Sequence, residues 1–382
     1  MTDRILSASV EDLRRSRTSL KWRLHPSDVL PLWVAEMDCA PCPAVLTAVT
    51  GAVRRGDTGY PWARDYADAF AGFAAGQWGW EVDAGSAHVV ADVLTGIARL
   101  LEVLTGPGPS VVVSSPVYNA FFTVIDAVGR GAVDAPLTRE GRLDPDTLAA
   151  AFEEVTSGGR SAVYLLANPH NPTGVVHTRG ELEMLARLAA EHDVTVISDE
   201  IHAALVYEPG SFTPYLTVAG SERGITVTSA SKAWNLAGLK AGLLIPGSEA
   251  RTLVGRLHPF VGFGASHLGV IAHTAAWTEG VDWVSRLVAE LDENRRLLAE
   301  LVSSRLPGVR LRLPEATYLG WLDCRALGLG DDPSAHFREK ARVALSDGPS
   351  FGAGGAGFAR LNFATSPGIL REAVDRMAES LG

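Results

Sequence analysis

Three short segments of the chain carry polar side chains that could take part in chemistry together. Ser229-Ala-Ser-Lys232 places one amine among small residues, and Asp199 ends the apolar run Val194–Ser198. Asn171 lies in Ala167–Gly174, which directly follows another apolar run. Short apolar runs rich in β-branched residues are typical of buried parallel strands. Since ligands bind beyond the C-terminal ends of such strands, the pattern predicts one site with an amine, a carboxylate and an amide.

Lys232 and Asp199 have the chemistry needed to hold and use pyridoxal phosphate (PLP), which carries an aldehyde and a pyridine ring. Desolvation beside Ser231 and Trp234 would favour the neutral, nucleophilic form of the Lys232 amine. A buried Asp199 needs a partner, and a pyridinium N–H would satisfy it and keep the ring an electron sink. The simpler alternatives are a solvent-exposed lysine and an aspartate that caps a helix. Glu200 could equally be the carboxylate that points inward.

Further residues could complete a PLP site. Asn171 precedes Pro172, and its amide could contact the phenolic oxygen of the cofactor or form a plain turn. Tyr118 follows an apolar run and could stack on the ring or belong to the core. Phosphate groups bind to helix N-terminal amides, hydroxyls and cations. We expect these groups from Leu94, Thr95, Ser229 and Lys240.

Arg360 is a candidate clamp for a substrate carboxylate. It lies in the strand-like alternation Phe358–Phe363, and arginine pairs bidentately with carboxylates. A surface arginine on a strand is the alternative. The glycine-rich segment Gly352–Gly357 lacks the strand-then-helix context of a phosphate loop, so we interpret it as an ordinary loop. No Gly-x-Ser-x-Gly sequence supports a serine hydrolase.

Length, charge and cysteine content limit the class of protein. With 382 residues the chain exceeds the size at which one core stops growing, so we expect two domains. A net charge of −10 without a long basic run argues against nucleic acid as a partner. We expect no secretory signal from Met1 onward, no membrane span and a cytoplasmic location. Cys39-Ala-Pro-Cys42 has the spacing of a redox or metal pair, but we interpret it as apolar filling and expect no metal site.

The order of the expected elements indicates an α/β fold. Between residues 85 and 245, apolar runs alternate with amphipathic segments such as Thr95–Leu104 and Glu181–His192. This pattern predicts a mostly parallel central sheet covered by helices. We expect a large PLP-binding domain over residues 46–280, and a smaller α+β domain built from residues 1–45 and 281–382.

The predicted elements of the smaller domain follow residue 280. They are a long helix over Val281–Leu306, half-exposed antiparallel strands over Val309–Leu313 and Thr317–Asp323, a helix near Ser334–Ala344, and a last helix from Ser366. The N-terminal segment that contains Val29–Asp38 has no helical period, and we assign it to the same domain. It would run back toward the active site.

Together these segments resemble the fold-type I PLP-dependent enzymes, the aspartate aminotransferase superfamily. Asn168–Gly174 and Ser229–Lys232 carry motifs that are specific for the superfamily. Leu30–Asp38 and Ser198–His202 are fairly specific for its MalY/PatB-like cystathionine β-lyase (C–S lyase) branch. The resemblance covers nearly the whole chain. Its further matches are Thr58–Tyr60, Ser115–Tyr118, Trp234–Leu239 and Arg360–Asn362.

The resemblance implies a role for each residue of a PLP site. Lys232 would hold the cofactor covalently, Asp199 would pair with the pyridine nitrogen and Tyr118 would stack on the ring. Asn171 would contact the phenolic oxygen, with His202 where many aminotransferases have a tyrosine. The phosphate would be bound by Ser229, Lys240, the helix start at Leu94 and Thr95, and Tyr60 from the neighbouring subunit of a homodimer.

The substrate side of the site is also implied by the resemblance. Arg360 would bind the substrate carboxylate, with Ala35 and Tyr60 as further contacts. One departure concerns the phosphate. The helix opens with Ala91–Ile97, whereas many relatives have a glycine near Val93, and this leaves open which amides hold the phosphate.

These observations predict α,β-elimination on a small amino acid substrate. Cystathionine or another S-substituted cysteine would yield a thiol, pyruvate and ammonia, with Lys232 as the base that removes the α-proton. The alternative is a class I/II aminotransferase, which would use the same residues. A third possibility is a PLP-binding regulator with little turnover, but no separate DNA-binding segment supports it.

Overall fold

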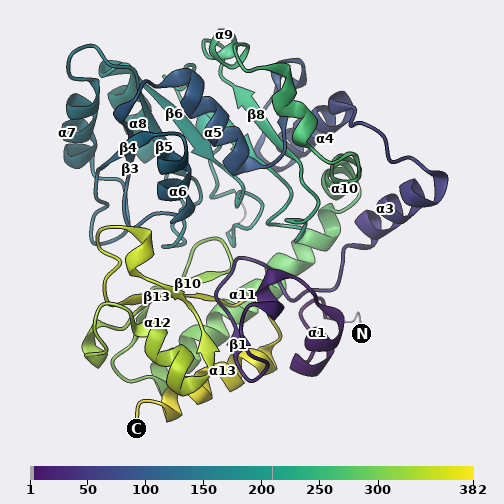
Figure 1. The fold of residues 1–382 in the computed structure, drawn as a ribbon, viewed down its shortest axis with the longest axis vertical. Coiled ribbons are helices and arrows are strands. Elements are labelled where there is room, and N and C mark those ends of the chain that lie inside the picture. The colour runs from purple at the N-terminus through teal and green to yellow at the C-terminus, as the bar shows by residue number, and fades with distance from the viewer. Residues whose placement is uncertain (1–3, 209) are drawn as a thin grey trace.

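The computed structural model describes residues 4–208 and 210–382 and forms two lobes (Figure 1). Residues 1–3, part of the segment in which we expected no secretory signal, lie outside the described residues. A seven-stranded sheet forms the centre of the upper lobe in this view, and a four-stranded sheet lies in the lower lobe. The chain begins in the lower lobe and returns to it along helix α11 (Val281–Arg305). The α/β fold is as expected, while the domain limits at residues 45 and 280 stay a prediction.

The large sheet has the strand order β2-β8-β7-β6-β5-β3-β4. All its strands run parallel except β8, which is antiparallel to both of its neighbours. The strands are β2 (His88–Val90), β3 (Gly108–Val113), β4 (Arg130–Asp134), β5 (Ala162–Ala167), β6 (Val194–Asp199), β7 (Ile225–Thr228) and β8 (Gly242–Pro246). Strands β5 to β8 are buried along their whole length, as continuous apolar runs predict. The edge strand β4 was not predicted, because its sequence Arg-Gly-Ala-Val-Asp contains no such run.

Helices cover both faces of this sheet. Successive residues of a strand point to opposite faces, so their packing partners show which helices lie on which face. Along β3, Val111 and Val113 pack in one hydrophobic cluster with Ile97, whereas Val112 packs in another with Leu148. The first face carries α5 (Val93–Leu104), α6 (Ala120–Ala127) and α9 (Arg251–Val254), and the second carries α7 (Pro145–Thr156) and α8 (Arg179–Glu191). A further group packs together beside them: α3 (Pro43–Arg55), α4 (Ala63–Trp78) and α10 (His267–Thr278).

The smaller sheet is antiparallel and has the order β12-β13-β10-β9. Its strands are β9 (Arg310–Leu311), β10 (Leu319–Asp323), β12 (Ser346–Asp347) and β13 (Phe358–Asn362). The N-terminal segment joins this lobe through β1 (Leu30–Pro31), which pairs in parallel with β11 (Val343–Ala344). The remaining helices of the lobe are α1 (Val10–Ser16), α2 (Leu20–Arg23), α12 (Pro333–His336) and α13 (Pro367–Glu379). Both ends of the chain therefore contribute to it.

The helix predicted near Ser334–Ala344 is too long. Helix α12 continues as a short π-helix that ends at Ala341. Arg342 then adopts the left-handed conformation, with a φ of 57°, and the chain enters β11. The apolar pattern over these residues does not distinguish a helix from the short buried strand that follows it.

Strand β10 was predicted to be half-exposed and is instead largely buried. Leu298 of the long helix packs over Gly320 on one face. On the other face Phe351 makes an edge contact with Trp321, at a centroid distance of 5.2 Å. This second face is covered only in part, since Trp321 and Asp323 remain partly exposed.

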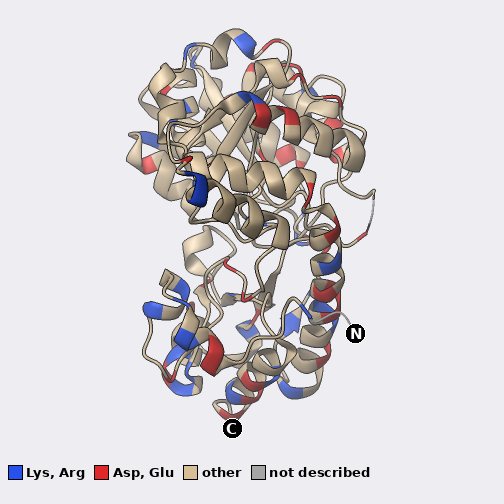
Figure 2. Cartoon of the chain, turned by 90° about the vertical axis from the view of Figure 1, so that its right-hand side faces the viewer, with Lys and Arg blue, Asp and Glu red and all other residues tan. Residues whose placement is uncertain are grey.

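The cysteines and the charged side chains are other groups that could mark a further kind of site. Cys39, Cys42 and Cys324 are free and buried, and burial raises the pKa of Cys39 to about 12, as expected of core filling. Charges of both signs are mixed along the chain (Figure 2). Within the described part of the chain, no helix is long and apolar enough to cross a membrane, and no group of three or more His, Cys, Asp or Glu side chains could hold a metal ion.

Candidate active site

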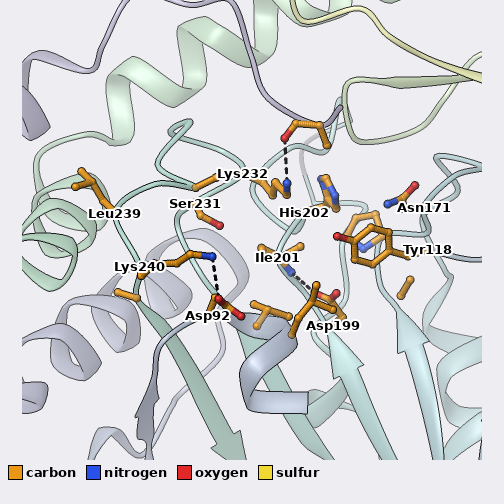
Figure 3. Close-up of a pocket in the computed structure, with 17 residues that line it drawn as sticks. Asp92, Tyr118, Asn171, Asp199, Ile201, His202, Ser231, Lys232, Leu239 and Lys240 are labelled. Carbon is orange, nitrogen blue, oxygen red and sulfur yellow. Dashed lines mark hydrogen bonds and ion pairs between the residues drawn. The ribbon is translucent and has the colours of Figure 1, made fainter. Parts of the chain in front are cut away.

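A cavity of about 170 Å³ lies at the C-terminal edge of the large sheet, where several strand ends meet (Figure 3). Strand β6 ends at Asp199 itself, while Tyr118, Asn171 and Lys232 follow β3, β5 and β7. Because β8 runs in the opposite direction, Lys240 just before it reaches the same edge. The structure brings these five side chains together, and their roles toward a cofactor stay predictions.

Lys232 presents its amine inside this cavity. It lies in a series of turns after β7, and its Nζ donates to the Ala35 carbonyl oxygen at 3.0 Å. Burial, and after it the positive charge of Arg360, lowers the pKa of Lys232 to about 8. A larger fraction of the amine is therefore neutral near pH 7 than for an exposed lysine, which favours a nucleophile or base.

Asp199 is the only carboxyl group at the end of β6 that faces the cavity. Its Oδ1 accepts a hydrogen bond from the Ile201 N–H at 3.1 Å. Burial raises the pKa of Asp199 to about 7, and this hydrogen bond and the charge of Lys232 oppose the shift only in part. Glu200, the alternative carboxylate, does not line the cavity, and its Oε1 accepts from the Tyr215 N–H at 2.8 Å on the other side of the strand end.

Arg360 lies behind the cavity lining and contacts Asn171, which does line the cavity. Its Nη1 donates to Asn171 Oδ1 at 3.0 Å, and its Nη2 donates to the Trp33 carbonyl and to Ser346 Oγ at 3.2 and 3.1 Å. The guanidinium lies over the ring of Phe351 and is 5% exposed, and burial lowers its pKa to about 10. Arg360 does not itself line the cavity, and its Nε has no partner among the described residues.

Tyr118 and His202 form the aromatic part of the lining. Burial raises the pKa of Tyr118, so its hydroxyl stays protonated at neutral pH. Burial, with the positive charges of Lys232 and Arg360, lowers the pKa of His202 to about 3. The imidazole is therefore neutral, and its buried Nδ1 finds no partner in the described part of the chain. Such an unpaired polar atom at the cavity is suited to a ligand.

At the end of the cavity next to helix α5, Asp92 contacts groups that were predicted to bind phosphate, and their phosphate role stays a prediction. Asp92 caps the helix, and its Oδ1 accepts from the Thr95 N–H at 2.8 Å. Its Oδ2 accepts from Lys240 Nζ at 2.9 Å (Figure 3). Two groups expected at a phosphate thus contact Asp92, while Leu94 lines the cavity.

Ser229 supports the turn that carries Lys232, and it is Ser231 that lines the cavity. Ser229 Oγ donates to the Ala241 carbonyl at 2.7 Å and accepts from the Ser231 N–H at 3.2 Å, so it holds the turn that carries Lys232. It does not line the cavity, whereas Ser231 does. A phosphate role for Ser229 stays a prediction.

Tyr60 lies outside the cavity, on the segment between α3 and α4. Its side chain is 84% exposed, and its ring makes an edge contact with Phe263 at 6.0 Å. It is not among the residues that line the cavity beside Lys232. Its predicted contribution to a neighbouring subunit is not tested by a single chain.

Sequence reasoning missed three features of the site: the contact of Asp92 with Lys240, the contact of the Ala35 carbonyl with Lys232, and the place of Ser231 in the cavity lining. Asp92 had a readable signal, because an aspartate directly before a helical run is a strong N-cap. Ser231 had none, since only the turn geometry decides which of two nearby serines faces the cavity. Ala35 was expected at the substrate, and its carbonyl accepts from both Lys232 and Tyr318, each at 3.0 Å.

The residues around the cavity fit PLP. They supply an amine for the aldehyde, a carboxyl group for the ring nitrogen, and an amide and an imidazole for the phenolic oxygen. A helix start and the Lys240 ammonium lie where a phosphate could bind. The unpaired Nδ1 of His202 is one buried atom that such a group could satisfy.

Comparison with known proteins agrees with this geometry. Residues 28–377 match the family "Aminotransferase class I and II". A Mycobacterium tuberculosis protein, provisionally named a cystathionine β-lyase, is 48% identical over 98% of this chain and 97% of its own length. The cystathionine β-lyase PatB of Bacillus subtilis is 33% identical over 96% of this chain and 98% of its own. The PLP-bound C–S lyase of Staphylococcus hominis superposes with a TM-score of 0.88, is 26% identical, and is covered over 97% of its length by 96% of this chain. The chain therefore belongs to the class I and II aminotransferase family, within its MalY/PatB-like branch.

Proposed function

We propose that this protein is a PLP-dependent C–S β-lyase that cleaves cystathionine or another S-substituted cysteine. The observation that carries the proposal is the meeting of Lys232 and Asp199 in one cavity. Both groups have shifted pKa values, and they form no ion pair with each other among the described residues. The names of the relatives, cystathionine β-lyase and C–S lyase, favour sulfur as the leaving atom.

When bound, PLP supplies an electron sink that stabilises the negative charge left by removal of the substrate α-proton. Lys232 would hold the cofactor covalently in the resting enzyme. Once released, its neutral Nζ would accept the α-proton. Asp199 would be the anion beside the ring nitrogen, and Tyr118 would stack on the ring. Asn171 and His202 would contact the phenolic oxygen.

Arg360 would orient the substrate by binding its α-carboxylate. The guanidinium is held by Trp33 and Ser346, so it is fixed before substrate arrives. Fixing the carboxylate would aim the α-C–H bond at Lys232, which is a positioning effect. On cleavage of the C–S bond the sulfur would leave as a thiolate and could take the proton held by Lys232, and one water molecule would convert the remaining three-carbon unit to pyruvate and ammonia.

A homodimer and a cytoplasmic location are parts of the same proposal. Exposed aromatic rings gather around Tyr60, and a cluster of this kind is typical of an interface. The exposed rings are Tyr60, Trp62, Phe260 and Phe263. In the dimer, Tyr60 would reach the phosphate bound in the partner's cavity. Sedimentation of the wild type and of Trp62→Ala tests this, because the variant should dissociate at lower protein concentration.

Incubation of the PLP-loaded protein with cystathionine, without any keto acid, tests the activity. We expect equal amounts of pyruvate, ammonia and thiol over many turnovers. Lys232→Ala is the matched control, and its pyruvate release should be lower by on the order of 10⁴-fold or more. Wild-type protein that binds PLP but forms no pyruvate from cystathionine or from a panel of S-substituted cysteines would contradict the proposal.

Aminotransfer is the second candidate, because the family as a whole bears that name. It predicts that an amino acid is consumed only when a keto acid is present, in a one-to-one ratio. The same incubation with and without 2-oxoglutarate separates the two reactions.

A further inference from the structure

Glu200 is a buried carboxyl group beside the site that the proposed reaction does not use. It follows Asp199 at the end of β6 and is 2% exposed. Successive residues of a strand point to opposite sides, so the Glu200 side chain points away from the cavity that Asp199 faces.

One oxygen atom of Glu200 joins three segments of the chain. Its Oε1 accepts hydrogen bonds from Ser198 Oγ at 2.9 Å, from the Tyr215 N–H at 2.8 Å and from Asn168 Nδ2 at 3.4 Å. The first donor lies on β6, and the second lies in the excursion between β6 and β7. The third lies at the start of the loop that follows β5.

This loop carries Asn171. Its first residue, Asn168, is bound twice to the end of β6: its N–H donates to the Asp199 carbonyl at 2.9 Å, and its side chain donates to Glu200. Asn168 Nδ2 also donates to the Thr213 carbonyl at 3.1 Å. Glu200 therefore contacts both the loop that carries Asn171 and the end of the strand that carries Asp199.

The surroundings of the second oxygen of Glu200 indicate that Glu200 acts as a hydrogen-bond acceptor and not as a negative charge. Oε2 is buried and has no hydrogen-bond partner in the described residues. An ionised carboxylate with one desolvated oxygen is costly. Burial raises the pKa of Glu200 to about 8, so the group is largely neutral at pH 7. Glutamine has the same shape and keeps the acceptor oxygen. Alanine removes it, which leaves the Ser198 hydroxyl and the Tyr215 N–H without a partner in the described residues and leaves Asn168 Nδ2 only the Thr213 carbonyl.

We propose that Glu200 is a positioning residue, which fixes Asn171 relative to Asp199 through the acceptor atom Oε1. The inference rests on the proposed function, because Asn171 and Asp199 are the groups expected at the phenolic oxygen and the ring nitrogen of PLP. The role depends on an accepting oxygen and not on a negative charge.

Glu200→Ala and Glu200→Gln test this inference together, with Asn294→Ala as a matched control. Asn294 is also fully buried, and its Nδ2 donates to the Phe363 and Thr365 carbonyls in the smaller lobe, away from the cavity. The PLP dissociation constant and the apparent pKa of the absorbance band of bound PLP are measured for each protein. Circular dichroism confirms that each variant is folded at the temperature used.

Glu200→Ala should weaken PLP binding by about tenfold and move the apparent pKa of the band, because unpaired donors displace the loop. Glu200→Gln should stay within about twofold of wild type for PLP binding, since the acceptor remains. Asn294→Ala should lower the melting temperature without moving the band. An alanine variant that matches wild type, or a glutamine variant as defective as alanine, overturns the inference while the proposed function stands. Wild-type protein that binds no PLP would contradict both the proposed function and this inference.

Discussion

Two lysine–aspartate sites in the described part of the chain differ in how their charges are satisfied. The Lys21 and Asp38 side chains are 0% and 2% exposed and form an ion pair at 2.8 Å. Trp22 Nε1 donates to the other Asp38 oxygen at 2.8 Å, and Lys21 also donates to a backbone carbonyl at 3.0 Å. Lys232 and Asp199 line one cavity, but in the described part of the chain no ion pair joins them.

This difference in charge pairing indicates that Lys21 and Asp38 stabilise the fold, whereas Lys232 and Asp199 are available for a reaction. At Lys21 and Asp38 each charge has a partner in contact, which compensates for the loss of water. In the cavity, burial lowers the pKa of Lys232 to about 8 and raises that of Asp199 to about 7. Groups shifted in this way gather at functional sites. An aldehyde and a pyridinium N–H would satisfy the amine and the carboxylate at once.

Lys232→Ala should have the largest effect on the reaction. Pyruvate release should fall on the order of 10⁴-fold or more, because the group that carries the proton is gone. The free energy of unfolding should change by only about 1 kcal/mol, since no ion pair is lost. Steady-state kinetics and urea unfolding of the same preparation measure both. A variant that retains wild-type turnover, or one that fails to fold, contradicts the comparison.

Lys21→Ala should have the opposite profile. It leaves Asp38 buried without its cation, which should cost about 3–5 kcal/mol of unfolding free energy. Urea unfolding measures the loss, and a double variant that also carries Asp38→Ala shows how much of it comes from the unpaired carboxylate. A loss below about 1 kcal/mol, as is usual for a surface pair, would show that this site is not structural.

Asp199→Asn should stabilise the PLP-free protein at high pH. The folded-state pKa of about 7 lies above that of an unfolded aspartate, about 3.9, so this group loses its stabilising contribution as pH rises from about 4 through 7. Asparagine has no charge to desolvate and can still accept from the Ile201 N–H. We expect a gain on the order of 1–3 kcal/mol at pH 8 and none at pH 4 in urea unfolding. A loss of stability at pH 8 would mean that Asp199 has a partner already.

The rate of PLP capture by the cofactor-free protein should follow the Lys232 amine. Only the neutral amine attacks the aldehyde, so below pH 8 the rate should rise about tenfold per pH unit and then level off. Arg360→Gln removes a positive charge that lowers this pKa, so its midpoint should move to higher pH. Stopped-flow absorbance measures both curves, and comparing them removes the titration of PLP itself. Identical midpoints would show that Arg360 does not act on the amine.

The sequence predicts the large sheet better than the smaller lobe, for a physical reason. Strands β5 to β8 are buried on both faces, so their apolar runs have a single interpretation. In the smaller lobe, β9, β11 and β12 have two residues each, too few to show a period. Their positions depend on pairing between distant segments, such as Leu30 with Val343. Local pattern does not contain that information.

The candidate site also has a part that the sequence predicts and a part that it does not. Asp199 and Lys232 could be placed because each follows a recognisable strand, and a strand end fixes which edge of the sheet a residue reaches. The orientation of Ser229, the pairing of Lys240 with Asp92 and the choice between Asp199 and Glu200 depend on side-chain directions. These are decided by turn geometry and by packing from other segments.

Borohydride reduction of the PLP-loaded protein, followed by peptide mapping, tests the central claim most directly, because it makes the bond between cofactor and lysine permanent. The chain has four lysines: Lys21, Lys232, Lys240 and Lys340. The account predicts one pyridoxyl group per chain, on Lys232. A label on Lys21, Lys240 or Lys340 instead, or no label on any lysine, would contradict it.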